Sequence, residues 1–195
     1  MTKIKSQLFF LLAFFMAFVV ALSNYLVQFP INYFGLENLL TYGAFSYPIA
    51  FLITDLSNRK YGKNIAKKIV YLGFVLGVFL TLYFSTNYSD LISIRIAIGS
   101  GTAFFVAQLI DVNVFDRLRK KIWFIAPLAS SLIGSSIDTF LFFFISFYGT
   151  GINWITLSFG DLSIKIFVAL MMLIPFRLLL SHIQEVSTIK KKISV

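Results

Sequence analysis

Long apolar segments separated by short polar loops run through almost the whole chain. A helix needs about 20 mainly apolar residues to cross the hydrocarbon core of a bilayer. Six segments of about this length lie near residues 6–29, 38–57, 69–86, 92–115, 122–148 and 162–182. The loops between them are mostly too short to fold separately. We therefore expect an all-α, polytopic membrane helix bundle with six transmembrane helices, in which residues 1–195 form a single transmembrane domain.

The composition agrees with lipid as the main solvent. Hydrophobic residues make up 58% of the chain, and only eight side chains are acidic. The mean hydropathy is +0.87. A soluble domain of 195 residues could not hide so much apolar surface in one core. The net charge of +9 does not indicate a nucleic-acid partner, because lysine and arginine occur in short clusters between the apolar segments.

Loops with basic clusters alternate along the chain with loops that have none. This pattern predicts the orientation of the chain in the membrane. They occupy the N-terminus, two of the loops and the C-terminus, at Lys3, Lys5, Arg59, Lys60, Lys63, Lys67, Lys68, Arg117, Arg119, Lys120, Lys121, Lys190, Lys191 and Lys192. The loops at 30–37, 87–94 and 149–161 carry no basic residue. Because loops rich in lysine and arginine stay in the cytoplasm, we expect a bacterial inner-membrane protein with both termini cytoplasmic. The first segment continues to Phe29 without a small-x-small cleavage site, so we expect a retained helix.

Catalytic and metal-binding chemistry is not indicated. Cysteine is absent and His182 is the single histidine, which leaves no thiolate or histidine cluster for a metal. The chain also lacks a phosphate-binding Gly-rich loop, a serine nucleophile elbow and a histidine for a catalytic triad. We therefore expect a protein that is not an enzyme and needs no cofactor.

Polar and aromatic side chains share one face of the segment at 38–57. They are Tyr47, Phe51, Thr54, Asp55 and Asn58, which fall within about 100° of one another at ~3.6 residues per turn. Aromatic faces can stack on a planar ligand, and a carboxylate can accept paired N–H donors. The alternative is that Asp55 and Asn58 only cap the helix end and pair with Arg59 or Lys63.

The segment at 92–115 carries Arg95 near one end, and Gln108 with Asp111 near the other. A charge inside a membrane segment costs about 2.5–3.5 kcal/mol at the centre, so we expect it to face a partner in the bundle. Arg95 and Asp111 lie on almost opposite faces of an ideal helix. We expect Gln108 and Asp111 to belong to a binding site and Arg95 to meet an outer partner. Alternatively, Asp111 pairs with Arg117 or Lys121.

The last two segments also contain charges. Asp138 lies well inside an apolar run, so it must find a proton, a cation or a hydrogen-bond donor. Small residues share its face and favour helix packing over ligand contact: Ser131, Gly134 and Ser135. Lys165 follows Asp161 by four residues, in the order that favours a helical ion pair. Lys165 could equally reach across to Asp138.

Three blocks of sequence together resemble one protein family. They are residues 47–62 (YPIAFLITDLSNRKYG), residues 95–111 (RIAIGSGTAFFVAQLID) with 114–117 (VFDR), and residues 130–139 (SSLIGSSIDT). In this order the chain resembles the queuosine precursor transporter family, which is also described as vitamin-uptake-transporter-like. The blocks spread over most of residues 45–182, and their combination is far more specific than any one of them.

This resemblance implies import of 7-deazaguanine compounds for the salvage of a tRNA modification. The implied cargoes are 7-cyano-7-deazaguanine and 7-aminomethyl-7-deazaguanine, with queuine as a further candidate. A deazaguanine offers adjacent N–H donors, acceptors and a flat ring to the polar interior. The candidate substrate-binding residues are Tyr47, Phe51, Asp55, Asn58, Arg95, Gln108, Asp111, Asp138 and Lys165. The sequence does not determine which carboxylate accepts hydrogen bonds from the N–H donors of the ligand.

The sequence is also compatible with other functions. The chain has the size of a substrate-binding subunit of an energy-coupling-factor-type vitamin importer, which would bind its cargo but need a partner to move it. A membrane-organising protein with no substrate would use its buried charges only to pair helices. Six helices enclose a path poorly, so a homodimer is compatible with the sequence. Import could be coupled to protons through Asp55 or Asp138, or could be facilitated diffusion.

Overall fold

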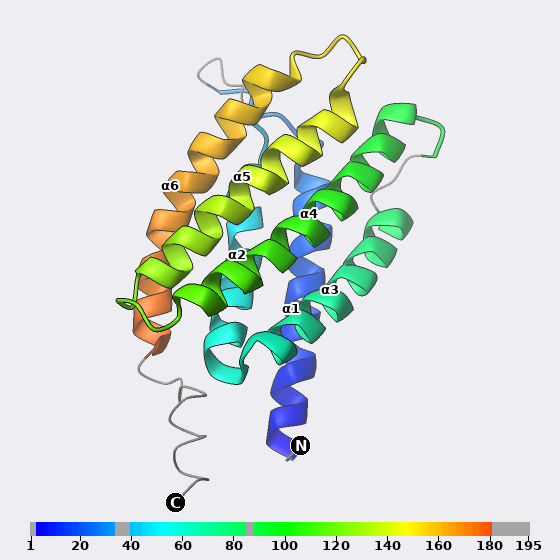
Figure 1. Ribbon diagram of the computed structural model, residues 1–195. Helices are drawn as coiled ribbons and strands as arrows, with labels where there is room; N and C mark the ends of the chain where they lie inside the picture. Colours follow the sequence, from blue (N-terminus) through cyan, green and yellow to red (C-terminus); the bar gives the residue numbers. More distant parts are fainter. Residues whose placement is uncertain (1–2, 34–39, 85–87, 181–195) are drawn as a thin grey trace, which may run out of the picture.

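The computed structural model describes residues 3–33, 40–84 and 88–180 and shows six α-helices (Figure 1). The helices are α1 (Lys3–Leu26), α2 (Gly43–Tyr61), α3 (Lys63–Phe84), α4 (Leu91–Leu118), α5 (Ile125–Phe147) and α6 (Trp154–Leu180). Within the described residues, extended pairing is limited to one isolated bridge between Pro30 and Thr41. The predicted all-α class is therefore confirmed.

Successive helices run in opposite directions through the bundle. The start of α1, the α2–α3 turn, the α4–α5 loop and the end of α6 lie at one end, and the α3–α4 and α5–α6 connections lie at the other (Figure 1). The described basic clusters at 59–68 and 117–121 thus share an end with the first turn of α1. The C-terminal cluster at 190–192 and His182 lie outside the described residues.

Four helix ends of the described structure differ from the predicted spans by more than a turn: both ends of α2, which is Gly43–Tyr61 rather than 38–57, and the starts of α3 and α6. Helix α6 begins at Trp154 rather than at 162, because the Asn153 side chain accepts a hydrogen bond from the backbone N–H of Thr156 (3.3 Å). Helix α3 begins at Lys63 rather than at 69, with only Gly62 (φ 86°) between it and α2. Hydropathy detects only the most apolar part of a helix, whereas α3 and α6 both begin in more polar sequence.

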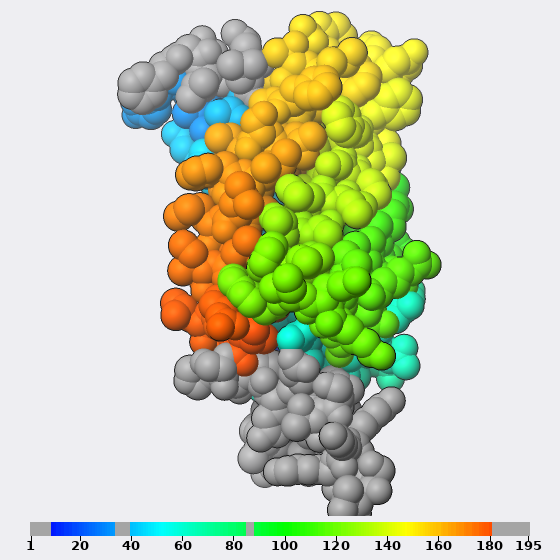
Figure 2. Space-filling model, turned by 60° about the vertical axis from the view of Figure 1, so that its left-hand side comes forward, coloured from blue at the N-terminus to red at the C-terminus, as the bar shows by residue number. Residues whose placement is uncertain are grey.

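Helix α2 is the central element of the bundle, although it is the least apolar helix. It contacts each of the other helices, and little of it is visible on the face shown in Figure 2, which α5 and α6 largely form. Five described helices are long and apolar enough to cross a membrane, namely α1, α3, α4, α5 and α6. Helix α2 is not among them, because it contains charged and polar residues that its neighbours bury.

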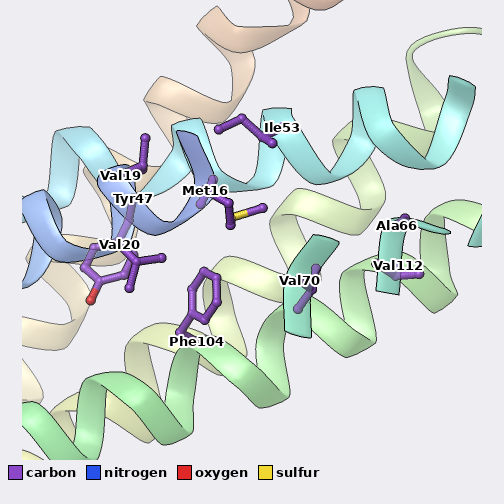
Figure 3. Close-up of a cluster of buried hydrophobic side chains, with 10 residues drawn as sticks. Met16, Val19, Val20, Tyr47, Ile53, Ala66, Val70, Phe104 and Val112 are labelled. Carbon is purple, nitrogen blue, oxygen red and sulfur yellow. The ribbon is translucent and has the colours of Figure 1, made fainter. Parts of the chain in front are cut away.

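Small residues allow α1 and α3 to pack closely. The core cluster of Figure 3 joins side chains from α1 to α4, including Met16, Val20, Tyr47 and Phe104. A Cβ atom added at Gly77 would lie 2.9 Å from Val20 Cγ1. Gly73 and Gly77 are four residues apart and face α1 together, in the small-xxx-small pattern of close helix pairs in membranes.

Replacing Gly77 by leucine should therefore destabilise the protein. The added side chain would push against Val20, and overpacking of this kind costs about 1–3 kcal/mol. The measurement is the thermal unfolding temperature of the purified protein in detergent. Val75→Leu is the matched control, because Val75 on the same helix is 60% exposed. An unfolding temperature of Gly77→Leu equal to that of the control would contradict the close approach of α1 and α3.

Candidate functional site

A ladder of hydrogen bonds joins α2 to α4 along the bundle. The Tyr47 and Ser100 hydroxyls share one (2.8 Å), the Thr54 hydroxyl donates to Gln108 Oε1 (2.5 Å), and Asn58 Nδ2 donates to the Val112 carbonyl (2.9 Å). The last two contacts are four residues apart on both helices, so α2 and α4 run side by side in the same direction. The polar stripe predicted on α2 thus points into the bundle, and all its members are buried.

Asn24 is a polar residue of the interior that sequence reasoning missed. Its side-chain oxygen accepts hydrogen bonds from the hydroxyls of Tyr47 and Ser100, and its Nδ2 donates to Thr81 Oγ1 (2.8 Å). Asn24 therefore links α1, α2, α3 and α4. The available signal was an amide inside the otherwise apolar segment 6–29.

Lys165 lies at the centre of a buried ion cluster. Its Nζ is 2.9 Å from Asp138 Oδ2 and 2.7 Å from Asp161 Oδ2. It also donates to Thr139 Oγ1 (3.0 Å), and that hydroxyl donates to Asp161 Oδ2 (2.8 Å). The two pairings considered for Lys165 thus coexist.

The ion cluster also constrains Tyr47. The Lys165 ammonium is 4.8 Å from the centre of the Tyr47 ring, a cation–π distance, and Lys165 is only 1% exposed. One face of the ring is therefore occupied by a cation of the protein, while its hydroxyl is engaged by Asn24 and Ser100. Tyr47 holds the cluster in place from α2.

Asp55 and Asp111 form a second buried acidic set, hereafter the carboxylate pair. Asp55 is 2% exposed and accepts from Ser130 (3.1 Å) and Ser131 (3.4 Å) of α5. Asp111 is fully buried, acts electrostatically on Asp55, and has the Ser130 hydroxyl nearby. Within the described ranges, neither carboxylate forms an ion pair. The alternative pairings with Arg59 or Lys63 and with Arg117 or Lys121 are therefore not formed.

Open hydrogen-bonding atoms gather on one stretch of α4. Among the described residues, Gln108 Nε2 and both carboxylate oxygens of Asp111 are buried without a partner in hydrogen-bond geometry. Gln108 and Asp111 are three residues apart, so they lie on the same side of the helix. An unused donor thus sits beside two unused acceptors, which complements the edge of a planar ligand carrying both N–H and C=O groups.

A narrow crevice leads towards the carboxylate pair between α2, α5 and α6. Asp55 and Ser131 supply its polar lining, and the rest is apolar: Pro48, Leu52, Pro127, Ala169, Met172, Leu173 and Phe176. The larger surface groove of the described structure is almost wholly apolar and is lined by α5 residues and Trp154. Of these two concave surfaces of the described structure, the crevice is the one that contains an ionisable side chain.

Three predicted site residues have local structural partners. Arg95 donates to the carbonyls of Ile145 and Tyr148 and thereby caps the end of α5, far along α4 from Asp111. Asn58 receives a hydrogen bond from Arg119. Phe51 packs on Gly134, where an added Cβ would lie 2.5 Å from the ring.

Removing the Lys165 ammonium should destabilise the protein strongly. Lys165→Met leaves Asp138 and Asp161 buried without their cation, and breaking a buried ion pair in this way costs about 3–5 kcal/mol. Thermal unfolding in detergent measures the loss. The combined variant Lys165→Met, Asp138→Asn, Asp161→Asn should recover much of it, since no charge is left unpaired. A Lys165→Met protein as stable as the unmodified chain would contradict this account of the cluster.

Comparison with known proteins agrees with this membrane architecture. Residues 41–180 match a family profile described as "Putative vitamin uptake transporter". A "Probable queuosine precursor transporter" of Haemophilus influenzae is 35% identical over 84% of this chain and 82% of its own length. A "Queuosine precursor transporter" of Escherichia coli K12 is 32% identical over 85% of this chain and 83% of its own length.

A third relative is more distant. A "Probable queuosine precursor transporter" of Bacillus subtilis is 30% identical over 68% of this chain and 66% of its own length. No solved structure matches the fold. The relatives and the profile describe transporters rather than enzymes. The chain belongs to this vitamin uptake transporter family, and the relatives named above are described as queuosine precursor transporters or probable ones.

Proposed function

We propose that this protein imports queuosine precursors across the bacterial inner membrane. The observation that carries the proposal is the open donor and acceptor pair formed by Gln108 and Asp111 inside a chain of this transporter family. A 7-deazaguanine presents adjacent N–H donors and a carbonyl on one edge. The donors would pair with the Asp111 carboxylate and the carbonyl with Gln108 Nε2, in one plane. Cyano and aminomethyl derivatives share this edge, and so does queuine.

The proposed topology has six crossings with both termini in the cytoplasm. Its support is the alternating direction of the helices and the common end shared by the described basic clusters and α1. Helix α2 has 19 residues and is about 28 Å long at ~1.5 Å per residue, close to the hydrocarbon thickness. Its polar residues are shielded from lipid by the other helices.

We further propose different roles for the nine candidate residues. Gln108 and Asp111 contact the substrate edge, with Asp55 beside them. Asp138 and Lys165 hold α5, α6 and α2 together, and the remaining members shape or brace the interior: Tyr47, Phe51, Asn58 and Arg95. We propose that residues 1–195 act as one transmembrane domain, to which helices α2, α4, α5 and α6 contribute the nine candidate residues.

Salvage of queuosine in cells tests this proposal. In a strain that cannot make the precursors, expression of the protein should restore queuosine in tRNA when a deazaguanine precursor is supplied at low concentration. Asp111→Asn and Gln108→Leu should each lower uptake by about tenfold or more, because each removes a hydrogen-bonding group that a buried ligand edge needs.

The matched control is Asp90→Asn. Asp90 caps α4 at its exposed N-terminus, accepting from the backbone of Ile92 and Ser93, and asparagine caps a helix equally well. This variant should salvage normally. Unmodified tRNA in cells whose membranes contain the unaltered protein would reject the proposed cargo.

A further inference from the structure

The structure contains two buried pairs of aspartates that differ in the charged group beside them. Asp138 and Asp161 share an ammonium group that belongs to the protein, with Lys165 within 2.9 Å of each. Among the described residues, Asp55 and Asp111 share no such group, although both are as deeply buried. No cation of the described ranges thus balances the second pair, which leaves room for one from solution.

We infer that the carboxylate pair, Asp55 with Asp111, holds one exchangeable proton, and that this proton is the ion whose gradient drives import. The inference rests on the proposed transport function. It selects between the two acidic positions that the sequence left open for coupling. Asp138 is not chosen because it already has a cation of the protein beside it, the Lys165 ammonium at 2.9 Å, which it shares with Asp161.

Hydrogen bonds between α2 and α4 hold the two carboxyl groups near each other. The Thr54–Gln108 bond (2.5 Å) and the bond from Asn58 to the Val112 carbonyl (2.9 Å) lie on either side of them. Ser130 of α5 donates to Asp55 at 3.1 Å and also faces Asp111. The pair is thus set by three helices rather than by one mobile side chain.

The surroundings offer no competing positive charge in the part of the chain that the structure describes. From α4 the group facing Asp55 is Asp111, and from α5 the groups are Ser130 and Ser131. Among the described residues, α6 presents only apolar side chains to the crevice, and α1 and α3 contribute none of its lining.

The nearest arginines in sequence are directed elsewhere. Arg59 Nη1 donates to the Arg119 carbonyl, and Arg119 donates to Asn58 and pairs with Asp116 (3.0 Å). Two buried carboxylates that act on each other and lie around the same Ser130 hydroxyl cannot both stay ionised at acceptable cost without a cation. A single shared proton removes one of the charges, as in other buried carboxyl dyads.

The arrangement links this proton to the substrate. Asp111 accepts from the precursor N–H groups when it is ionised, so Asp55 is then the member that keeps the proton. One proton binds Asp55 from the outer side, travels with the precursor and leaves to the cytoplasm, and no bond of the precursor changes. Asp55 lines the crevice between α2, α5 and α6, whereas Asp111 is not among the residues that line it.

Infrared spectroscopy of the full-length protein in liposomes tests the proton without requiring transport. At neutral pH the unaltered protein should show the C=O stretching band of a buried protonated carboxyl, shifted by deuterium oxide. The band should be lost in the double variant Asp55→Asn, Asp111→Asn. It should remain in the single variant Asp90→Asn. Absence of any protonated carboxyl band at neutral pH in the unaltered protein would overturn the inference, and so would a band that persists in the double variant.

Uptake into the same liposomes tests the coupling. With a labelled deazaguanine, an inside-alkaline gradient of one pH unit should raise accumulation up to about tenfold for one proton per substrate. Asp55→Asn should abolish this stimulation, and Asp90→Asn should retain it. Uptake that is indifferent to the pH gradient, or that responds to a sodium gradient instead, would overturn coupling by a proton.

The two tests also separate this inference from the proposed function. Absence of deazaguanine uptake under every gradient would reject the proposed function and, with it, the coupling role. The infrared band would still decide whether the carboxylate pair holds a proton. Uptake without pH dependence would reject the coupling while the transport function stands.

Discussion

The structure depends on the burial of one polar helix among five apolar ones. Lipid offers no hydrogen bonds, so each polar group on α2 must find its partner in a neighbouring helix. Asn24, Ser100, Gln108, Val112 and Ser130 supply these partners from α1, α4 and α5. The apolar helices can therefore face the lipid, while the polar side chains gather around α2.

The two buried acidic sets divide structural and functional roles. Around Lys165 the hydrogen bonds are complete, because the ammonium, two carboxylates and the Thr139 hydroxyl satisfy one another. Around Asp111 they are incomplete, with open donor and acceptor atoms on α4. A satisfied network fixes helix positions, whereas an unsatisfied buried group favours any ligand that completes it. A ligand that satisfies the open hydrogen-bonding atoms would therefore bind most favourably at the second set.

The helical class and the buried polar face of α2 could be predicted from sequence, because hydropathy and helical periodicity depend on local order. The start of α6 could not, because the Asn153 cap lies in a stretch with no apolar run to reveal it. Pairings of buried charges could be predicted only as alternatives, such as Asp161 or Asp138 as the partner of Lys165. Nothing local shows that Lys165 contacts two carboxylates at once, or that Arg95 caps α5 through Ile145. The family resemblance, which rests on the combination of blocks, was confirmed by the comparisons.

The single residue Gly62 between α2 and α3 has a consequence for how the protein is made. Helix α2 is too polar to partition into lipid readily by itself, whereas α3 is strongly apolar. A joint of one residue with φ of 86° keeps the two helices together as a tight hairpin, which is the unit that would enter the membrane. During biogenesis the apolar α3 would thus carry its polar neighbour into the bilayer, and assembly of the polar interior would begin with that step.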